Sequence, residues 1–185
     1  MRLFVSIDFP GYICEELYSR VPDIHGWRKT PAGQIHLTLF FIGDCTQAEM
    51  AKISEFLTGI EFQPFELIIK NVGVFPGRED PAILWSGVES TRELMNLQKK
   101  VETTLLPFRK KPVRKPFFPH ITLARRKGNS GNSSLVEELL TSEERELRYV
   151  VDRFSLKKSL LNPGGSEHHL LKVLKSGNAD KLSGC

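Results

Sequence analysis

The sequence is poor in the residues that build disulfides, metal sites and common nucleophiles. Its three cysteines are odd in number and far apart, which argues against a disulfide framework and a zinc knuckle; they are Cys14, Cys45 and Cys185. No His-x-x-x-His or Cys-x-x-Cys pair occurs, so we expect neither a metal nor a cofactor. No glycine-rich loop precedes a helix, and no serine or cysteine stands in a nucleophile elbow. Any chemistry must therefore rest on other side chains.

Long hydrophobic runs are missing too. The apolar segment 3–7 is too short for the core of a signal peptide and ends at Asp8, and no stretch is long enough to span a membrane. With 185 residues, 40% of them hydrophobic, and a formal net charge of +4, the chain can form one domain or two small lobes with a shared core. We therefore expect a cytoplasmic monomer that does not bind membranes.

One four-residue pattern is present twice. Residues 36–39 read His-Leu-Thr-Leu and residues 120–123 read His-Ile-Thr-Leu. Because side chains alternate across a strand, the histidine and threonine of each copy face one side and the two aliphatic residues face the other. Two such strands placed side by side would gather two imidazoles and two hydroxyls around one hollow.

This set of side chains suits metal-free chemistry on a phosphodiester. The unperturbed pKa of histidine, about 6.5, lets His36 and His120 take or give a proton near neutral pH. The hydroxyls of Thr38 and Thr122 can donate hydrogen bonds to the nonbridging oxygens, where charge develops. Arg125 adds a guanidinium fork that matches a phosphate. These five residues are the candidate site.

Each of these residues also has a structural interpretation. A lone strand histidine is more often structural, threonine favours strands, and Arg125 could be a surface cation; it is the pairing of the two motifs that favours catalysis. We take the remaining histidines, His25, His168 and His169, as structural or surface residues. Basic residues flank the second motif, and they form either a solvated loop or a phosphate-binding surface. They are Arg109, Lys110, Lys111, Arg114 and Lys115 before the motif, and Arg125, Arg126 and Lys127 after it.

Hydrophobic periodicity and turn residues predict an α+β fold. We expect strands at 3–9, 34–42, 65–74, 82–88, 120–125, 146–156 and 168–174, and helices at 11–21, 46–57, 91–106 and 135–140. In each half of this order a His-x-Thr strand follows the first helix, which predicts a pseudo-duplicated, bilobal arrangement. We expect a single bilobal domain over residues 1–175 and a polar, disordered tail over 176–185.

At these residues the chain resembles the 2H phosphoesterases, and within them the RNA 2′,3′-cyclic phosphodiesterases, historically called 2′-5′ RNA ligases. The likeness covers about residues 1–174 and is carried by the segments 2–8, 34–44, 73–76, 83–88 and 118–125. The resemblance implies a bilobal α+β fold in which two antiparallel sheets flank a central groove, with the helices outside.

The resemblance also implies a reaction. It is the metal-independent hydrolysis of RNA 2′,3′-cyclic phosphate ends to 2′-phosphomonoesters, with reversible 2′-5′ RNA ligation as a further activity, on RNA partners that include tRNA fragments. As a hypothesis, His36 is the general acid and His120 the general base; the near-symmetry of the motifs leaves the reverse open. Two alternatives remain: a non-catalytic module that binds a nucleotide or RNA end, and a cyclic phosphodiesterase acting on a small nucleotide such as an ADP-ribose cyclic phosphate.

Overall fold

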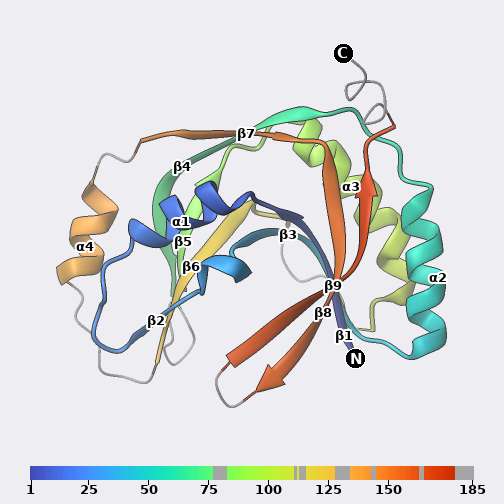
Figure 1. Ribbon diagram of the computed structural model, residues 1–185, viewed down its shortest axis with the longest axis horizontal. Helices are drawn as coiled ribbons and strands as arrows, with labels where there is room; N and C mark the ends of the chain where they lie inside the picture. Colours follow the sequence, from blue (N-terminus) through green and yellow to red (C-terminus); the bar gives the residue numbers. More distant parts are fainter. Residues whose placement is uncertain are drawn as a thin grey trace.

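The computed structural model describes residues 1–76, 83–110, 112, 116–127, 134–142, 145–162 and 165–177 (Figure 1). The strands are β1 (Arg2–Asp8), β2 (Trp27–Lys29), β3 (His36–Asp44), β4 (Phe65–Phe75), β5 (Ile83–Val88), β6 (His120–Arg126), β7 (Leu147–Val151), β8 (Arg153–Asn162) and β9 (Gly165–Lys175). The helices are α1 (Gly11–Ser19), α2 (Gln47–Thr58), α3 (Arg92–Leu105) and α4 (Ser134–Thr141), with short 3-10 turns at Ala32–Gln34 and Leu106–Phe108. Two parts of the prediction lie outside the described residues: the tail from residue 178 onward, and the cations Lys111, Arg114 and Lys115.

The strands form one antiparallel sheet in the order β7-β4-β5-β6-β3-β1-β8-β9, with β2 paired to β6. The α+β class is confirmed. The two expected sheets are joined at the middle of this order, where β3 and β6 share one residue pair, Leu37 with Ile121. This join divides the sheet into a lobe of β7, β4, β5, β6 and β2 and a lobe of β3, β1, β8 and β9.

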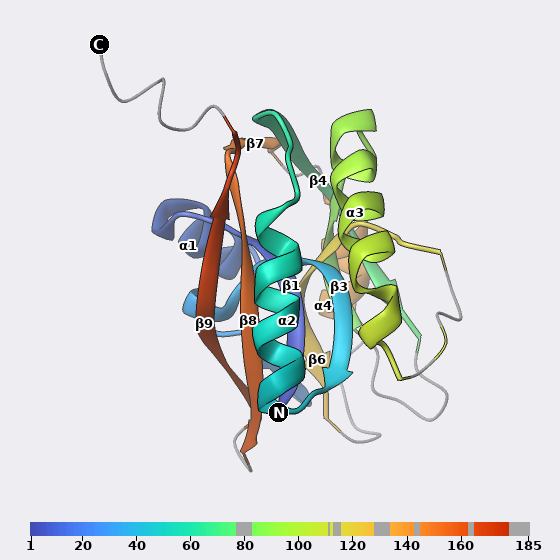
Figure 2. The ribbon, with the colours of Figure 1, turned by 90° about the vertical axis from the view of Figure 1, so that its right-hand side faces the viewer.

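The two lobes do not correspond to the two halves of the sequence. Strand β4 belongs to the first half but pairs with β5 and β7. The last strands, β8 and β9, return to the lobe of β3 and β1, where β8 pairs with β1. The chain thus exchanges strands between the lobes, which ties them together. Figure 2 shows α2 and α3 side by side along one side of the sheet.

The strands differ from the prediction in number and in extent, and β8 runs to Asn162, past the predicted end at residue 156. The single strand expected at 146–156 is split at Asp152 into β7 and β8, because β7 pairs with β4 in one lobe and β8 with β1 in the other. Alternating hydrophobicity does not reveal such a change of partner. Strand β2 was not predicted, since three residues are too few for a periodic signal.

The helices form where the sequence provides caps and apolar stripes. Thr46 and Glu49 close a capping box on α2, with hydrogen bonds of 2.7 and 3.2 Å. Helix α3 buries an apolar stripe made of Leu94, Leu97, Val101 and Leu105. One hydrophobic cluster spans both lobes and includes Leu37 and Ile121 at the join. Within the described ranges, no helix combines the length and the apolar character needed to cross a bilayer.

Candidate active site

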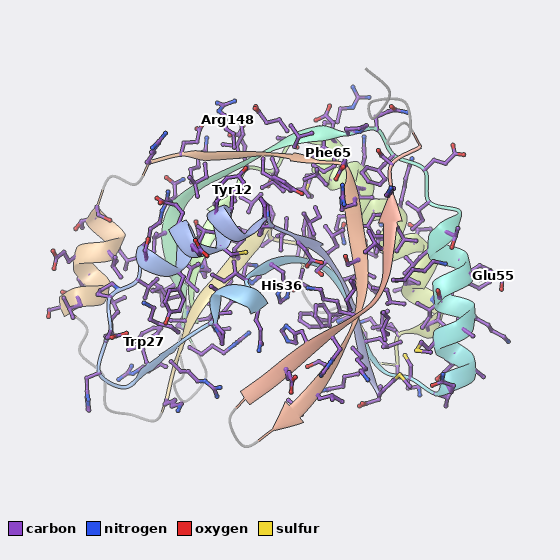
Figure 3. The ribbon with its side chains drawn as sticks, in the orientation of Figure 1. Tyr12, Trp27, His36, Glu55, Phe65 and Arg148 are labelled. Atoms are coloured by element: carbon purple, nitrogen blue, oxygen red, sulfur yellow. The ribbon has the colours of Figure 1, made fainter. Side chains whose placement is uncertain are left out.

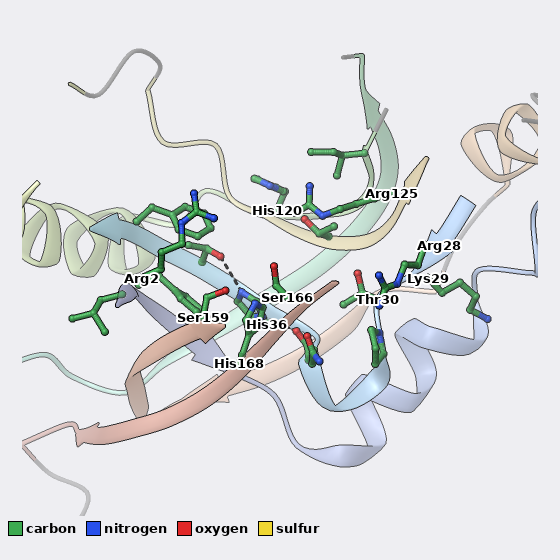
Figure 4. A pocket seen from close by; sticks show the side chains of 18 of the residues that line it. Arg2, Arg28, Lys29, Thr30, His36, His120, Arg125, Ser159, Ser166 and His168 are labelled. Carbon is green, nitrogen blue, oxygen red and sulfur yellow. Dashed lines mark hydrogen bonds between the residues drawn. The ribbon is translucent and has the colours of Figure 1, made fainter. Parts of the chain in front are cut away.

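A pocket of about 690 Å³ opens over the join of β3 and β6. It is lined by all five residues predicted from the sequence: His36, Thr38, His120, Thr122 and Arg125. Figure 3 places His36 in the interior of the molecule, while Glu55 of α2 and Arg148 of β7 lie at its periphery. Figure 4 shows His36 on one side of the pocket and His120 and Arg125 on the other.

The register of the two motif strands explains why these side chains meet. The antiparallel pair of Leu37 with Ile121 sets His36 opposite Thr122 and Thr38 opposite His120. The backbone register therefore brings both His-x-Thr pairs to the same place in the sheet. Leu37 and Ile121 themselves are fully buried on the opposite face, as the alternation of the pattern predicts.

Each of the two histidines is held by a hydrogen bond of the same kind. His36 Nδ1 lies 2.7 Å from the carbonyl oxygen of Gln34, and His120 Nδ1 lies 2.8 Å from that of Phe118. A carbonyl oxygen can only accept, so Nδ1 donates in both rings and Nε2 is the nitrogen left for chemistry. Thr38 Oγ1 lies 3.1 Å from His36 Nε2 and can donate to it.

The surroundings favour the neutral form of both rings. Burial lowers the pKa of His36 to about 4; the nearby Lys157 and His168 add to this effect, while the Gln34 carbonyl and Asp8 oppose it. Burial also lowers the pKa of His120, helped by the Arg125 charge and opposed by the Phe118 carbonyl. A phosphate anion in the pocket would raise both pKa values by supplying an opposite charge.

An ion pair lies behind His36. Asp8 is its cross-strand neighbour on β1, and the carboxylate lies 2.6 Å from Lys157 Nζ of β8. Ser6 donates a further hydrogen bond of 3.1 Å to the same carboxylate. Because Asp8 is engaged by Lys157 and Ser6, it does not pair with the imidazole, which is consistent with a neutral His36.

An aromatic wall supports His120. The Phe75 ring meets the imidazole edge-on at 5.0 Å between centroids, and Phe118 lies 6.2 Å from it. Trp85 packs on both phenylalanines, at 5.1 and 5.2 Å. The wall therefore restricts the His120 ring from the side of β4 and β5.

The pocket residues that sequence reasoning missed include Arg2, Arg28, Phe41 and His168. Arg28 of β2 is the cross-strand partner of Arg125, but β2 was too short to predict. His168, interpreted above as structural or surface, lines the pocket. No motif surrounds it on β9, so only the return of this strand to the lobe of β3 and β1 reveals its position. His25 is exposed and His169 does not line the pocket.

Of the basic residues before the second motif, the structure describes Arg109 and Lys110, and neither lines the pocket. Arg109 lies over the Phe40 ring at 5.1 Å, and Lys110 pairs with Glu49 at 3.7 Å. Among the described residues, no group of three or more histidine, cysteine or acidic side chains could hold a metal ion. The absence of a metal from the reaction stays a prediction.

The fold and the two facing His-x-Thr strands define a 2H phosphoesterase. The protein TT0787 of Thermus thermophilus has a similar structure, with a TM-score of 0.74 at 26% identity over 95% of this chain and 97% of that one. Escherichia coli LigT, solved with 3′-AMP, aligns with a TM-score of 0.76 at 23% identity over 95% and 98% of the two chains.

Sequence comparison places the chain within this class. Residues 24–162 match the 2′-5′ RNA ligase superfamily, and the chain belongs to it. A relative from Archaeoglobus fulgidus, named RNA 2′,3′-cyclic phosphodiesterase, is 32% identical over 180 residues, which are 95% of this chain and all of the relative. A Thermus thermophilus relative of the same name is 31% identical over 93% of this chain and 88% of its own length.

Proposed function

We propose that the protein hydrolyses the 2′,3′-cyclic phosphate at the 3′ end of RNA to a 2′-phosphomonoester, without a metal. The observation that carries the proposal is the pair of imidazoles facing one pocket, each with Nδ1 held by a carbonyl and Nε2 left for chemistry. A water oxygen bonds to phosphorus, the bond from phosphorus to the 3′ oxygen breaks, one imidazole takes the water proton and the other protonates the 3′ oxygen. The names of the relatives support this reaction.

The burial of His36 favours the reverse of the roles assigned from the sequence. A general base must be unprotonated, and His36, with a pKa of about 4, is neutral well below pH 7. We therefore assign His36 as the base that activates water and His120 as the acid. An entering phosphate anion raises the pKa of His120, which favours the protonated form that an acid needs. When the phosphate enters, the Thr38 hydroxyl turns from His36 Nε2 to the phosphate, which frees that nitrogen to act as the base. Thr38, Thr122 and Arg125 then hold the phosphate oxygens.

Three features of the pocket favour a nucleotide at an RNA end. Phe41 lines the pocket with 59% of its surface exposed, which offers a ring face for stacking a base. Arg2 and Arg28 add positive charge beyond Arg125, suited to backbone phosphates. We further propose that the protein is a cytoplasmic monomer and that its substrates include the cyclic-phosphate ends of cleaved tRNA. The reverse reaction would be 2′-5′ ligation.

A product analysis on an oligoribonucleotide with a 2′,3′-cyclic phosphate end, in excess EDTA, tests the proposal. We expect a 2′-phosphomonoester, and a loss of turnover of roughly 10²- to 10⁴-fold in His36→Ala and His120→Ala. His25→Ala, an exposed histidine outside the pocket, is the matched control and should retain full activity.

Other results of this experiment would support the alternative functions or contradict the mechanism. Binding without turnover would identify the non-catalytic module, and turnover of small cyclic nucleotides alone would identify the second alternative. Activity that disappears in EDTA would overturn the metal-free mechanism.

A further inference from the structure

We propose that His168 is a third imidazole of the active site, which stays neutral and donates a hydrogen bond from Nε2 to an oxygen of the reacting phosphate. This inference rests on the proposed function and adds one substrate contact to it. His168 belongs to β9, which carries neither motif, and reaches the pocket because the β8–β9 hairpin packs on β1.

The imidazole of His168 lies next to that of His36. The two rings meet edge-on at 80°, with 5.1 Å between centroids (Figure 4). Both also pack against the Phe4 ring, His36 at 5.2 Å and His168 at 4.9 Å. A phosphate within reach of His36 therefore also lies beside His168.

Only one nitrogen of His168 can serve a ligand. Nδ1 is buried and has no hydrogen-bond partner in the described part of the chain. A proton on Nδ1 would bury an unsatisfied donor close to the Lys157 cation, whereas a bare lone pair there is the cheaper arrangement. The neutral tautomer therefore carries its proton on Nε2, which is then the donor that His168 offers to a ligand in the pocket.

Burial and the cations of two neighbouring strands disfavour the imidazolium form of His168. Burial lowers the pKa of His168 most, followed by Lys157 of β8 and Arg125 of β6; Asp8 of β1 opposes them, and His169 adds a small lowering. Asp8 is itself paired with Lys157, at 2.6 Å. His168 therefore acts as a hydrogen-bond donor and not as a general acid.

Two substitutions separate this role from packing against Phe4. His168→Phe keeps an aromatic ring but loses the donor, and should lower kcat/KM on the cyclic-phosphate oligonucleotide by roughly 10- to 100-fold. His168→Gln keeps a neutral N–H donor and should recover most of that loss, with a pH profile of unchanged shape. His169→Phe, the adjacent residue outside the pocket, is the control and should match the wild type.

The inference is overturned if His168→Phe keeps wild-type kcat/KM, if His168→Gln is as poor as His168→Phe, or if His168→Gln loses one limb of the pH profile. Thermal unfolding of each variant confirms that folded proteins are compared.

A measurement without turnover keeps the inference distinct from the proposed function. Inorganic phosphate is titrated into the ¹⁵N-histidine-labelled wild type at pH 7, and the Nε2–H resonance of His168 should shift while Nδ1 stays unprotonated. An unchanged His168 signal at saturating phosphate, or a proton on both nitrogens, overturns the inference. A wild type that hydrolyses no cyclic phosphate overturns the proposed function instead, and the titration still decides the role of His168.

Discussion

At the scale of single residues, the pocket contains three imidazoles that differ in what holds them. His36 and His120 each donate from Nδ1 to the carbonyl oxygen two residues earlier, so their Nε2 atoms can exchange protons. His168 lacks such a carbonyl partner and presents only a donor. The same side chain can thus serve as base, acid or neutral donor, depending on its neighbours.

The low pKa of His36 makes a prediction about stability. Its pKa of about 4 in the folded protein lies below its value in the unfolded chain, about 6.5, so the unfolded chain binds more protons between these values. The contribution of His36 to stability is complete above about pH 6.5 and falls by about 3 kcal/mol as the pH drops through 4. His36→Gln has no such group. Urea unfolding from pH 4 to 7.5 should show the wild type losing stability relative to His36→Gln as the pH falls, and parallel curves would contradict this.

At the scale of elements, strands β4 and β5 position the wall behind His120. Gly73 of β4 lies opposite Trp85 of β5, and the indole covers the glycine. A Cβ at Gly73 would overlap atoms of the Trp85 ring. The indole can rest against Phe75 and Phe118 only because residue 73 has no side chain.

Gly73→Ala should therefore damage both stability and activity. Displacing the indole should cost about 1–3 kcal/mol of unfolding free energy, as overpacking does, and should free the His120 ring. Denaturant unfolding, near-UV circular dichroism and turnover measure these effects. Gly11→Ala, where a Cβ meets nothing within 4 Å, is the control and should leave all three near wild type. Wild-type turnover in Gly73→Ala would show that the wall does not position His120.

At the scale of the whole molecule, the active site depends on how the two lobes meet. Only the pair of Leu37 with Ile121 joins β3 to β6 within the sheet, and the two histidines belong to different lobes. The strands exchanged between the lobes and the shared core hold this join in register. These features support one domain over residues 1–175, which stays a prediction.

Leu37→Ala tests the join against an equally buried position elsewhere. Leu37 and Leu17 are both 0% exposed, and truncating either should lower the unfolding free energy by about 2–5 kcal/mol. Only Leu37→Ala should also lower turnover, by roughly 10- to 100-fold, because it shifts one histidine relative to the other. Turnover is measured at a temperature where both variants are folded. Equal turnover in the two variants would contradict a role for the join in catalysis.

The sequence alone determined the local features of this protein. The positions of His36, Thr38, His120 and Thr122 on one face of each strand follow from side-chain alternation, a property of the strand itself. The α2 capping box and the buried stripe of α3 are likewise set within a few turns of chain. The family resemblance followed from the same short segments.

Only the tertiary structure decided what brings these features together. The split at Asp152, the pairing of Arg28 with Arg125 and the arrival of His168 depend on which strand lies beside which, and pairing partners leave no periodic trace in the sequence. The low pKa of His36, which favours the base role, comes mainly from burial, and burial is a property of the assembled lobes and not of the motif.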